Sequence, residues 1–384
     1  MKIKKTRSIV KKLQRELKKV KSYKEQMAAL TDEQLQAKTK EFKQKLADGK
    51  TLDDIMPEAF AAMCEADLRV LKMYPFDVQI MAGIALHKGY LAEMNTGEGK
   101  TLTATLPMYL NGLEGKGAIL VTNNEYLALR DAEEMGPAYE FMGLTIAAGV
   151  KRDESEKFEN DEKKEIYACD IVYTTHSALG FDYLINNLVK SAKERFLRDF
   201  NYIIIDEADS VLLDSASTPL VISGAPRVQS NLYETADFFI RTLKEDEDYE
   251  VEEKNVWFTE KGLEYAESYF GIDNIFAPEY FEIYRHLVLA LRAHMIIEKG
   301  TEYMISESGE VALIDASSGR MLKGVKLRGG QHQAIECKEQ VEITQENRSM
   351  ASITYQNFFS MFPKMSGMSG TIYDAKDELY DVYG

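Results

Sequence analysis

The stretch Leu91-Ala-Glu-Met-Asn-Thr-Gly-Glu-Gly-Lys-Thr101 decides the fold of this chain. The apolar run Gly89-Tyr-Leu-Ala92 predicts a buried strand, and residues 102–110 predict a helix. A strand, a glycine-rich turn, Gly-Lys-Thr and a helix form the pattern of a phosphate-binding loop, in which backbone N–H groups surround an anion at the positive end of the helix. Lys100 would then reach the outer phosphates, and the Thr101 hydroxyl would coordinate Mg²⁺.

The match to the strict pattern G-x-x-x-x-G-K-[ST] is incomplete, because its first glycine position holds Met94. From this stretch alone, the alternative is a glycine-rich strand-to-helix turn with an incidental lysine. A second motif in the right place would favour nucleotide binding. Residues 202–209, Tyr-Ile-Ile-Ile-Asp-Glu-Ala-Asp, supply that motif.

This second motif is an apolar strand that ends in two carboxylates. Asp206 at the strand end would hold Mg²⁺, directly or through water, and Glu207 would orient and deprotonate the attacking water. The alternative is an acidic strand-to-helix turn. It is disfavoured because the pair follows a buried type of strand about a hundred residues after Gly-Lys-Thr. Together the two motifs predict a site for a nucleoside triphosphate.

Apolar strands alternate with helical segments around these motifs. Strands are expected at residues 117–122, 144–150 and 170–175, and a helix is expected over residues 180–199. This alternation predicts an α/β fold, with a parallel sheet covered by helices on both faces. Ligands of such sheets bind at the carboxyl ends of the strands, where both motifs lie.

The alternation stops near residue 220. Residues 220–348 contain helices and short strands without a nucleotide motif, so we expect an inserted α+β domain there. His286 and His294 lie on a helix expected over residues 279–298. We interpret both as partly exposed polar positions rather than as metal ligands.

The regular pattern returns after the insertion. Residues 347–362 are expected to form a helix. Met365 to Gly370 alternates small and apolar residues, as a core strand followed by a tight turn does. We therefore expect this strand to rejoin the sheet.

Charge and composition limit the partners. The chain of 384 residues has a formal net charge of −16, which disfavours nucleic-acid binding. Residues 1–24 nevertheless carry eleven Lys/Arg and one Glu around an apolar stripe at helical spacing. This basic helix predicts contact with an anionic membrane surface or a partner, and packing on its own domain is the equal alternative.

The remaining composition indicates a cytosolic protein. Cys64, Cys169 and Cys337 are far apart and have no metal-ligand spacing, so we interpret them as reduced packing residues. No apolar stretch approaches the roughly 20 residues that span a bilayer. The basic N-terminus has no continuous apolar core, so it does not have the pattern of a signal peptide.

Several stretches together resemble the SecA family, the ATPase motors that drive preproteins through the SecY channel. They are residues 76–79, 93–107, 124–132, 180–184, 205–210, 218–224 and 351–359. The resemblance implies ATP and Mg²⁺ as cofactors. It also accounts for Met94, because the loop of this family lacks the leading glycine.

The resemblance assigns roles to individual residues. Gln79 would read the adenine edge, with Met73 and Phe76 beside it. Asp206 would assist the metal, and Glu207 would be the catalytic base. The residues expected to hold the phosphates and Mg²⁺ are Gly97, Glu98, Gly99, Lys100 and Thr101. The coupling motif that senses the nucleotide state would be Gly370-Thr371.

The resemblance also implies domains and partners. Residues 1–219 and 349–384 would form the first nucleotide-binding domain, a RecA-like fold of the DEAD type. Residues 220–348 would form the preprotein cross-linking domain. The partners implied are a preprotein, a SecY-type channel and acidic phospholipids that contact the N-terminal helix, with a homodimer as a further option and no nucleic acid. The location would be cytoplasmic, peripheral to the inner face of the bacterial cell membrane.

The sequence departs from the family pattern in three places. Asp214-Ser-Ala-Ser217 replaces Asp-Glu-Ala-Arg, and Thr175-His-Ser-Ala178 replaces Thr-Asn-Asn-Glu, which suggests an accessory-type SecA. The chain also reaches Gly384 where the second RecA-like lobe of the family should begin. That lobe supplies an arginine finger, so we expect an N-terminal fragment with very slow hydrolysis by itself.

Two other functions stay open at this stage. Asp206-Glu-Ala-Asp209 spells the box of DEAD-type nucleic-acid helicases, so the chain could be a lobe of such a helicase. The acidic composition and the large insertion disfavour this alternative. A peptide-binding module with a vestigial phosphate loop is the other alternative.

Overall fold

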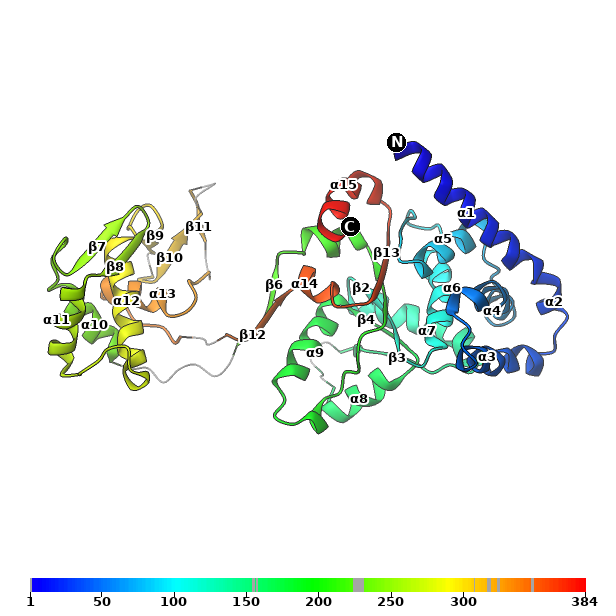
Figure 1. The fold of residues 1–384 in the computed structure, drawn as a ribbon, viewed down its shortest axis with the longest axis horizontal. Coiled ribbons are helices and arrows are strands. Elements are labelled where there is room, and N and C mark those ends of the chain that lie inside the picture. The colour runs from blue at the N-terminus through cyan, green and yellow to red at the C-terminus, as the bar shows by residue number, and fades with distance from the viewer. Residues whose placement is uncertain are drawn as a thin grey trace. The chain divides into compact units, whose positions relative to one another are not determined.

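A computed structural model of the chain describes residues 2–153, 156, 158–223, 231–306, 308–315, 319–322, 325–346 and 349–384, without the side chains of residues 2–7, 223 and 349. Gly224 and Asn347, which belong to stretches discussed above, lie outside the described residues. The chain divides into two compact units (Figure 1). Unit 1 is Met1–Ile222 with Ala351–Gly384, and unit 2 is Ser223–Met350.

Unit 1 is built on a six-stranded sheet in the order β1-β13-β5-β2-β4-β3. Every neighbouring pair of strands is parallel, which confirms the predicted sheet. The strand expected at residues 365–370 is present as well, as β13. The strands are β1 (Leu91–Glu93), β2 (Ala118–Thr122), β3 (Ile146–Ala148), β4 (Ile171–Thr175), β5 (Tyr202–Asp206) and β13 (Lys364–Ser369).

The sheet has a hydrophobic core on each face. Successive side chains of a strand point to opposite faces, so Leu120 and Ile204 enter one core while Ile119 and Ile203 enter the other. The helices of the first core include α4 (Leu52–Ala66), α5 (Asp77–His87), α6 (Lys100–Gly112) and α7 (Glu125–Phe141). Those of the second are α8 (Asn160–Ala168), α9 (His176–Leu188), α14 (Tyr355–Phe359) and α15 (Ile372–Tyr383). The α/β class with helices on both faces is therefore confirmed.

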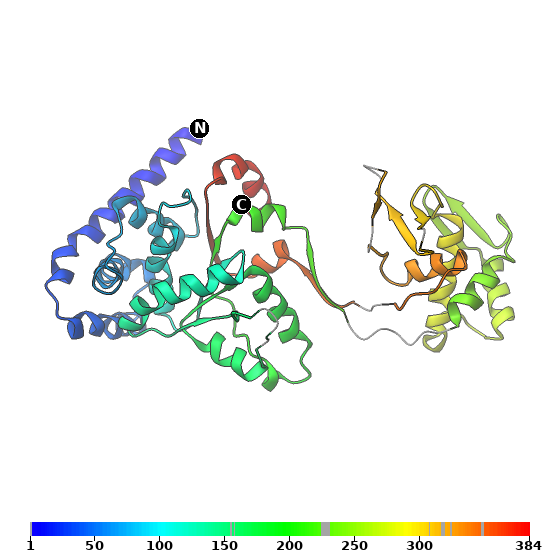
Figure 2. The same ribbon diagram turned by 180° about the vertical axis from the view of Figure 1, so that it is seen from behind.

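The basic N-terminal helix packs on unit 1. Helix α1 (Lys2–Ser22) lies along α4 and α5, on the outside of the unit in Figure 2, and is followed by α2 (Lys24–Ala28) and α3 (Asp32–Ala47). Leu17 and Val20 are buried in the first core, whereas Val10 is 40% exposed. The second half of the apolar stripe of α1 therefore packs on the helix's own domain. Within the described residues, no helix is long and apolar enough to cross a membrane.

The helix expected over residues 180–199 is wrong in both bounds. Helix α9 begins at His176, because the Thr175 side chain caps it by accepting a hydrogen bond from the N–H of Ala178 at 3.1 Å. It ends at Leu188. The Asn186 side chain accepts hydrogen bonds from the N–H groups of Phe196 and Leu197, which holds the chain as it folds back.

The helix expected over residues 347–362 is also wrong. Residues Ser349–Thr354 form strand β12, which pairs with β6 (Pro219–Ser223), and only Tyr355–Phe359 is helical. The Thr354 side chain caps this short helix by accepting from the N–H of Asn357 at 3.3 Å. Pairing with a strand more than a hundred residues away in the sequence therefore overrides the local helical pattern.

Unit 2 has the predicted α+β composition. Its described helices are α10 (Leu232–Ile240), α11 (Glu260–Phe270), α12 (Phe281–Met295) and α13 (Gln331–Lys338). Its strands form a hairpin of β7 (Tyr249–Glu252) and β8 (Asn255–Phe258), and an antiparallel sheet of β9 (Tyr303–Ile305), β10 (Val311–Ile314) and β11 (Met321–Leu322).

One of the two histidines of α12 is less exposed than expected. His286 is 4% exposed and packs edge-on against the ring of Tyr233, with ring centroids 4.5 Å apart. The Nε2 atom of His294 lies 2.6 Å from Oδ1 of Asp237. Both side chains thus serve the packing of unit 2, and the expectation of partly exposed positions is wrong for His286.

Candidate nucleotide site

The order of the strands brings three motifs to one edge of the sheet. Strand β13 lies between β1, which precedes the phosphate loop, and β5, which ends at Asp206. The register pairs Glu93 with Ser369, and Met368 with Asp206. The phosphate loop, Gly370-Thr371 and Asp206-Glu207 therefore leave the carboxyl edge of the sheet side by side, where ligands of parallel sheets bind.

Two glycines shape the phosphate loop. Gly97 and Gly99 have φ angles of 85° and 81°, which side chains with a Cβ rarely adopt. A Cβ atom at Gly99 would lie 2.2 Å from Nε2 of Gln79, whereas one at Gly97 would have no neighbour within 4 Å. The turn is closed by Glu98, whose carboxylate accepts a hydrogen bond from the N–H of Asn95 at 2.9 Å. This backbone bond and a second from the Asn95 side chain lower the pKa of Glu98.

Gln79 connects the loop with the start of α5. Its buried side chain donates from Nε2 to the carbonyl oxygen of Glu98 at 2.8 Å and accepts at Oε1 from the N–H of Phe76 at 2.8 Å. The predicted neighbours of an adenine ring lie on the outside of this connection. Phe76 is 74% exposed and Met73 is 41% exposed, so both offer apolar surface to a ligand.

Lys100 contacts both carboxylates of the second motif. Its Nζ donates a hydrogen bond to Oε1 of Glu207 and lies 3.3 Å from Oδ1 of Asp206. Burial lowers the pKa of Lys100, but the bond to Glu207 and the charge of Asp206 outweigh burial and raise the pKa above its ordinary value. Burial raises the pKa of Asp206, although the charge of Lys100 opposes this.

Glu207 has an unusual backbone. Its φ angle of 51° lies in the left-handed region, which costs a residue with a side chain on the order of 1–3 kcal/mol. The N–H of Glu207 donates to Oδ1 of Asp206 at 3.0 Å, and Oε2 of Glu207 accepts from the Ser369 hydroxyl at 3.3 Å. The strained turn aims both carboxylates at the phosphate loop.

Comparison with known proteins decides the family. A family model described as the SecA DEAD-like domain matches residues 1–380. The chain belongs to this family. The prediction of a SecA-family protein is therefore confirmed.

Two similar relatives carry the same name. "Protein translocase subunit SecA 2" of Streptococcus gordonii is 55% identical over 379 residues, which are 97% of this chain and 48% of that protein. The protein of the same name from Lactobacillus johnsonii is 48% identical over 378 residues, with the same shares of both chains. The chain thus spans about half the length of the curated relatives it matches. Among solved structures, a DEAD box protein from the hyperthermophile Methanococcus jannaschii is 25% identical, with a TM-score of 0.30 over 38% of this chain and 39% of that one.

The geometry of this SecA-family chain adds three residues to those the sequence singled out. Ser369 contacts Glu207, as described above. Oδ2 of Asp209 accepts a hydrogen bond from the Thr371 hydroxyl. Asp131 of α7 is buried beside Arg130, and burial raises its pKa, with a contribution from the charge of Asp206. Asp209 is the last residue of the Asp-Glu-Ala-Asp motif that the sequence shows, but no local sequence pattern marks Ser369 or Asp131.

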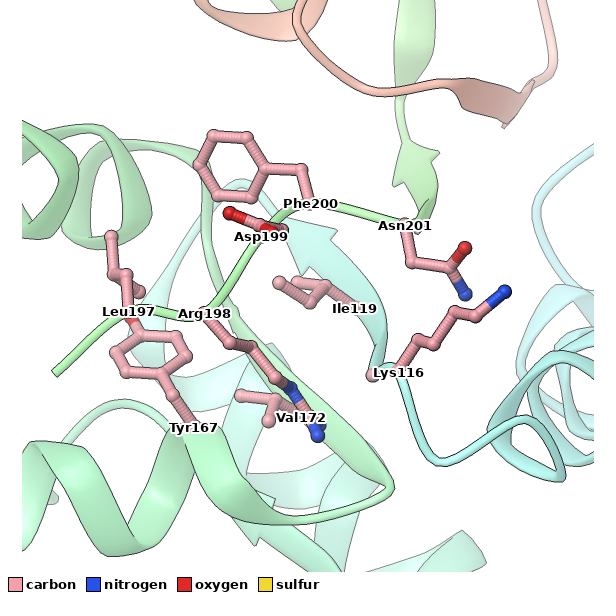
Figure 3. A pocket seen from close by; sticks show the side chains of 10 residues that line it. Lys116, Ile119, Tyr167, Val172, Leu197, Arg198, Asp199, Phe200 and Asn201 are labelled. Carbon is pink, nitrogen blue, oxygen red and sulfur yellow. The ribbon is translucent and has the colours of Figure 1, made fainter.

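The pocket in Figure 3 lies at the other end of the sheet, where β2, β4 and β5 begin. Its lining includes Lys116, Ile119, Val172, Arg198 and Asn201. The cavity has a volume of only about 10 Å³, which is room for about one water molecule. Arg198 donates hydrogen bonds to the carbonyl oxygens of Gly115 and Cys169 there. We therefore regard this pocket as part of the packing of the strand entries.

Proposed function

We propose that this chain is the ATP-binding motor portion of an accessory SecA-type translocase, which couples ATP hydrolysis to the export of preproteins through a SecY-type channel. The observation that carries the proposal is the contact of Lys100 with Asp206 and Glu207 beside the phosphate loop. A lysine between two carboxylates is poised to exchange them for phosphate oxygens. The names of the SecA 2 relatives support translocation as the work that hydrolysis drives.

The chemistry proposed for the site is phosphoryl transfer to water. The ammonium of Lys100 binds the outer phosphates, which releases Glu207 from its hydrogen bond. Glu207 then accepts a proton from the attacking water, whose oxygen forms a bond to the γ-phosphorus as the bond to the β-phosphate oxygen breaks. Gln79, with Met73 and Phe76 beside it, holds the adenine ring. Gly370-Thr371 reports the nucleotide state through the contact of Thr371 with Asp209.

The donor set fits Mg²⁺. This ion prefers oxygen ligands and is usually held by one or two carboxylates together with substrate phosphates. Asp206 and the hydroxyl of Thr101 would supply the protein oxygens. Among the described residues, no group of three or more His, Cys, Asp or Glu side chains could hold a metal by itself, which is in keeping with an ion held mainly by phosphates. When bound, Mg²⁺ neutralises charge that develops on the phosphates.

The domains and partners belong to the same proposal. Residues 1–219 and 349–384 would be the first nucleotide-binding domain, and residues 220–348 the preprotein-binding domain. Unit 2 exposes large apolar side chains that suit an unfolded chain, among them Phe238, Phe276 and Phe281, which are 69%, 63% and 58% exposed. We propose a location on the cytoplasmic face of the membrane, with acidic lipids contacting the basic first half of α1, a homodimer as an option, and no nucleic acid as partner.

Hydrolysis by residues 1–384 alone is proposed to be slow. The resemblance assigns an arginine finger to a second lobe, and such a residue contributes about 10³- to 10⁵-fold to the rate. The test is a comparison of turnover by residues 1–384 and by the complete protein. A rate near one per second for residues 1–384 would overturn this part of the proposal.

Calorimetry with ADP and Mg²⁺ tests nucleotide binding itself. We expect the wild type to bind and the Lys100→Ala variant to lose most of its affinity. Lys116→Ala is the matched control, because Lys116 is an exposed lysine of the same unit at the opposite end of the sheet. Equal heats for the wild type and Lys100→Ala would favour a peptide-binding module with a vestigial phosphate loop. Stimulation of the complete protein by RNA rather than by a preprotein would favour a helicase.

A further inference from the structure

Asp67 is a fully buried carboxyl group with no role in the function proposed above. It is 0% exposed and begins the π-helical turn η1 (Asp67–Leu71), which continues α4. Single π turns within helices occur frequently at functional sites. This turn leads into residues 73–79, which carry Met73, Phe76 and Gln79, and which we call the base-side segment.

The contacts around Asp67 fit a carboxyl group that carries a proton. Oγ1 of Thr105 lies 2.8 Å from Oδ2 of Asp67 and 2.7 Å from the carbonyl oxygen of Leu102. A hydroxyl has one proton to donate, and a carbonyl oxygen can only accept. Both contacts are hydrogen bonds together if Asp67 donates to Thr105 and Thr105 donates to Leu102.

The surroundings agree with this assignment. Burial raises the pKa of Asp67 well above its ordinary value, and the contact with Thr105 only partly opposes this. Within the described residues, the other oxygen, Oδ1, has no hydrogen-bond partner. A buried carboxylate left in this state would be far more costly than a neutral acid.

Asp67 connects the two halves of the nucleotide site. Its side chain contacts Thr105 on α6, the helix that begins at Lys100, and through it Leu102 in the first turn. Its carbonyl oxygen accepts hydrogen bonds from the N–H groups of Lys72 and Met73, where the chain turns into the base-side segment. Asp67 thus binds the base-side segment through its backbone and the phosphate helix, α6, through its side chain.

We propose that Asp67 is a positioning residue for nucleotide binding: its uncharged carboxyl group fixes the base-side segment relative to the phosphate helix α6. The inference rests on the proposed function, because it concerns the geometry of that site. A ligand that spans base and phosphates depends on this connection. A ligand that consists of phosphates alone does not.

The test compares two probes, ADP and inorganic pyrophosphate, each with Mg²⁺, by calorimetry on the complete protein. Asp67→Val removes the hydrogen bond while keeping apolar bulk in the buried site. We expect its affinity for ADP to fall about tenfold, the effect of one lost hydrogen bond, and its affinity for pyrophosphate to stay within about twofold. Asp67→Asn still donates to Thr105, so it is expected to restore the affinity for ADP.

The chain offers a matched control on the same helix. Thr103 is also 0% exposed, and its hydroxyl has no hydrogen-bond partner among the described residues. Thr103→Val is therefore expected to leave both affinities unchanged. Thr105→Val removes the same hydrogen bond as Asp67→Val from the other side, and it takes over the test if Asp67→Val does not fold by circular dichroism.

The outcomes separate this inference from the proposed function. Equal losses for ADP and pyrophosphate would make Asp67 merely structural and overturn the inference. Unchanged affinity for ADP in Asp67→Val and Thr105→Val would overturn it as well, with the proposed function intact. If the wild type binds neither probe, the proposed function fails and the inference falls with it.

Discussion

Replacing each glycine of the phosphate loop by alanine in turn separates two energetic costs: the conformational cost of a positive φ angle, and a steric clash with Gln79. Gly97 and Gly99 have nearly the same φ angle, 85° and 81°, so the conformational cost of a Cβ atom should be similar at both. This cost is about 1–2 kcal/mol, which corresponds to a loss of about 5- to 30-fold in affinity if the loop must keep its shape to hold phosphates. Only at Gly99 does the new Cβ meet a neighbour, Nε2 of Gln79 at 2.2 Å.

The clash at Gly99 adds a second cost. Gln79 can move away only by giving up its hydrogen bond to the carbonyl of Glu98, which is worth about 0.5–1.5 kcal/mol. Gly99→Ala should therefore bind ADP a further 2- to 12-fold or so more weakly than Gly97→Ala. Calorimetry with ADP measures both affinities, and urea unfolding checks that the variants fold.

A double-mutant cycle isolates the cause. In a Gln79→Ala background the Cβ at residue 99 has lost its neighbour, so Gly99→Ala and Gly97→Ala should cost the same. Equal affinities of the two glycine variants in the wild-type background would refute the reasoning, because the Gln79 contact would then have no energetic weight.

Three further predictions concern other parts of unit 1. Ser369→Ala removes the hydroxyl that donates to Glu207, so turnover should fall about 2- to 12-fold while ADP affinity is unchanged; a parallel loss of both would contradict a role in orienting Glu207. Asp67→Asn should gain stability over the wild type as the pH rises. Burial raises the pKa of Asp67 well above 3.8, so above pH 4 the unfolded chain has released a proton that the folded chain retains. The wild type then loses about 1.4 kcal/mol of unfolding free energy per pH unit, up to the folded pKa, relative to Asp67→Asn; a difference independent of pH in urea unfolding would show that Asp67 is ionised. Leu17→Ala should destabilise unit 1 by about 2–4 kcal/mol in urea, whereas Val10→Ala, at an exposed position of the same helix, should change stability by less than about 0.5 kcal/mol; equal effects would contradict the packing of α1.

The sequence was sufficient to predict the fold class and the ends of two critical strands. The apolar run before Asp206 and the alternating small and apolar residues before Gly370 predicted core strands, and Gly-Lys-Thr marked the start of α6. Local sequence patterns could not predict the order of the strands in the sheet. Nothing near residue 369 indicates that β13 lies between β1 and β5, because this depends on pairing across the whole domain.

The misjudged elements have the same physical cause. Residues 349–354 form a strand because β6 is available to pair, and α9 ends at Leu188 because the Asn186 side chain binds the returning chain. The side chains of Glu207 and of the buried Asp67 likewise have their partners far away in the sequence, at Lys100 and Thr105. Sequence motifs thus predict which charged residues belong to the site, whereas tertiary contacts determine the conformation and hydrogen bonds of those residues.

The most direct test of the central claim is the turnover of ATP by a Glu207→Gln variant of the complete protein, measured beside its affinity for ATP. The glutamine keeps the length of the side chain and one oxygen that can accept from Lys100, but it cannot take a proton from water. We expect ATP affinity within about threefold of the wild type, and turnover lower by about 10²- to 10⁴-fold. Turnover close to that of the wild type would contradict the account, because the carboxylate that the structure places beside Lys100 would then have no part in hydrolysis.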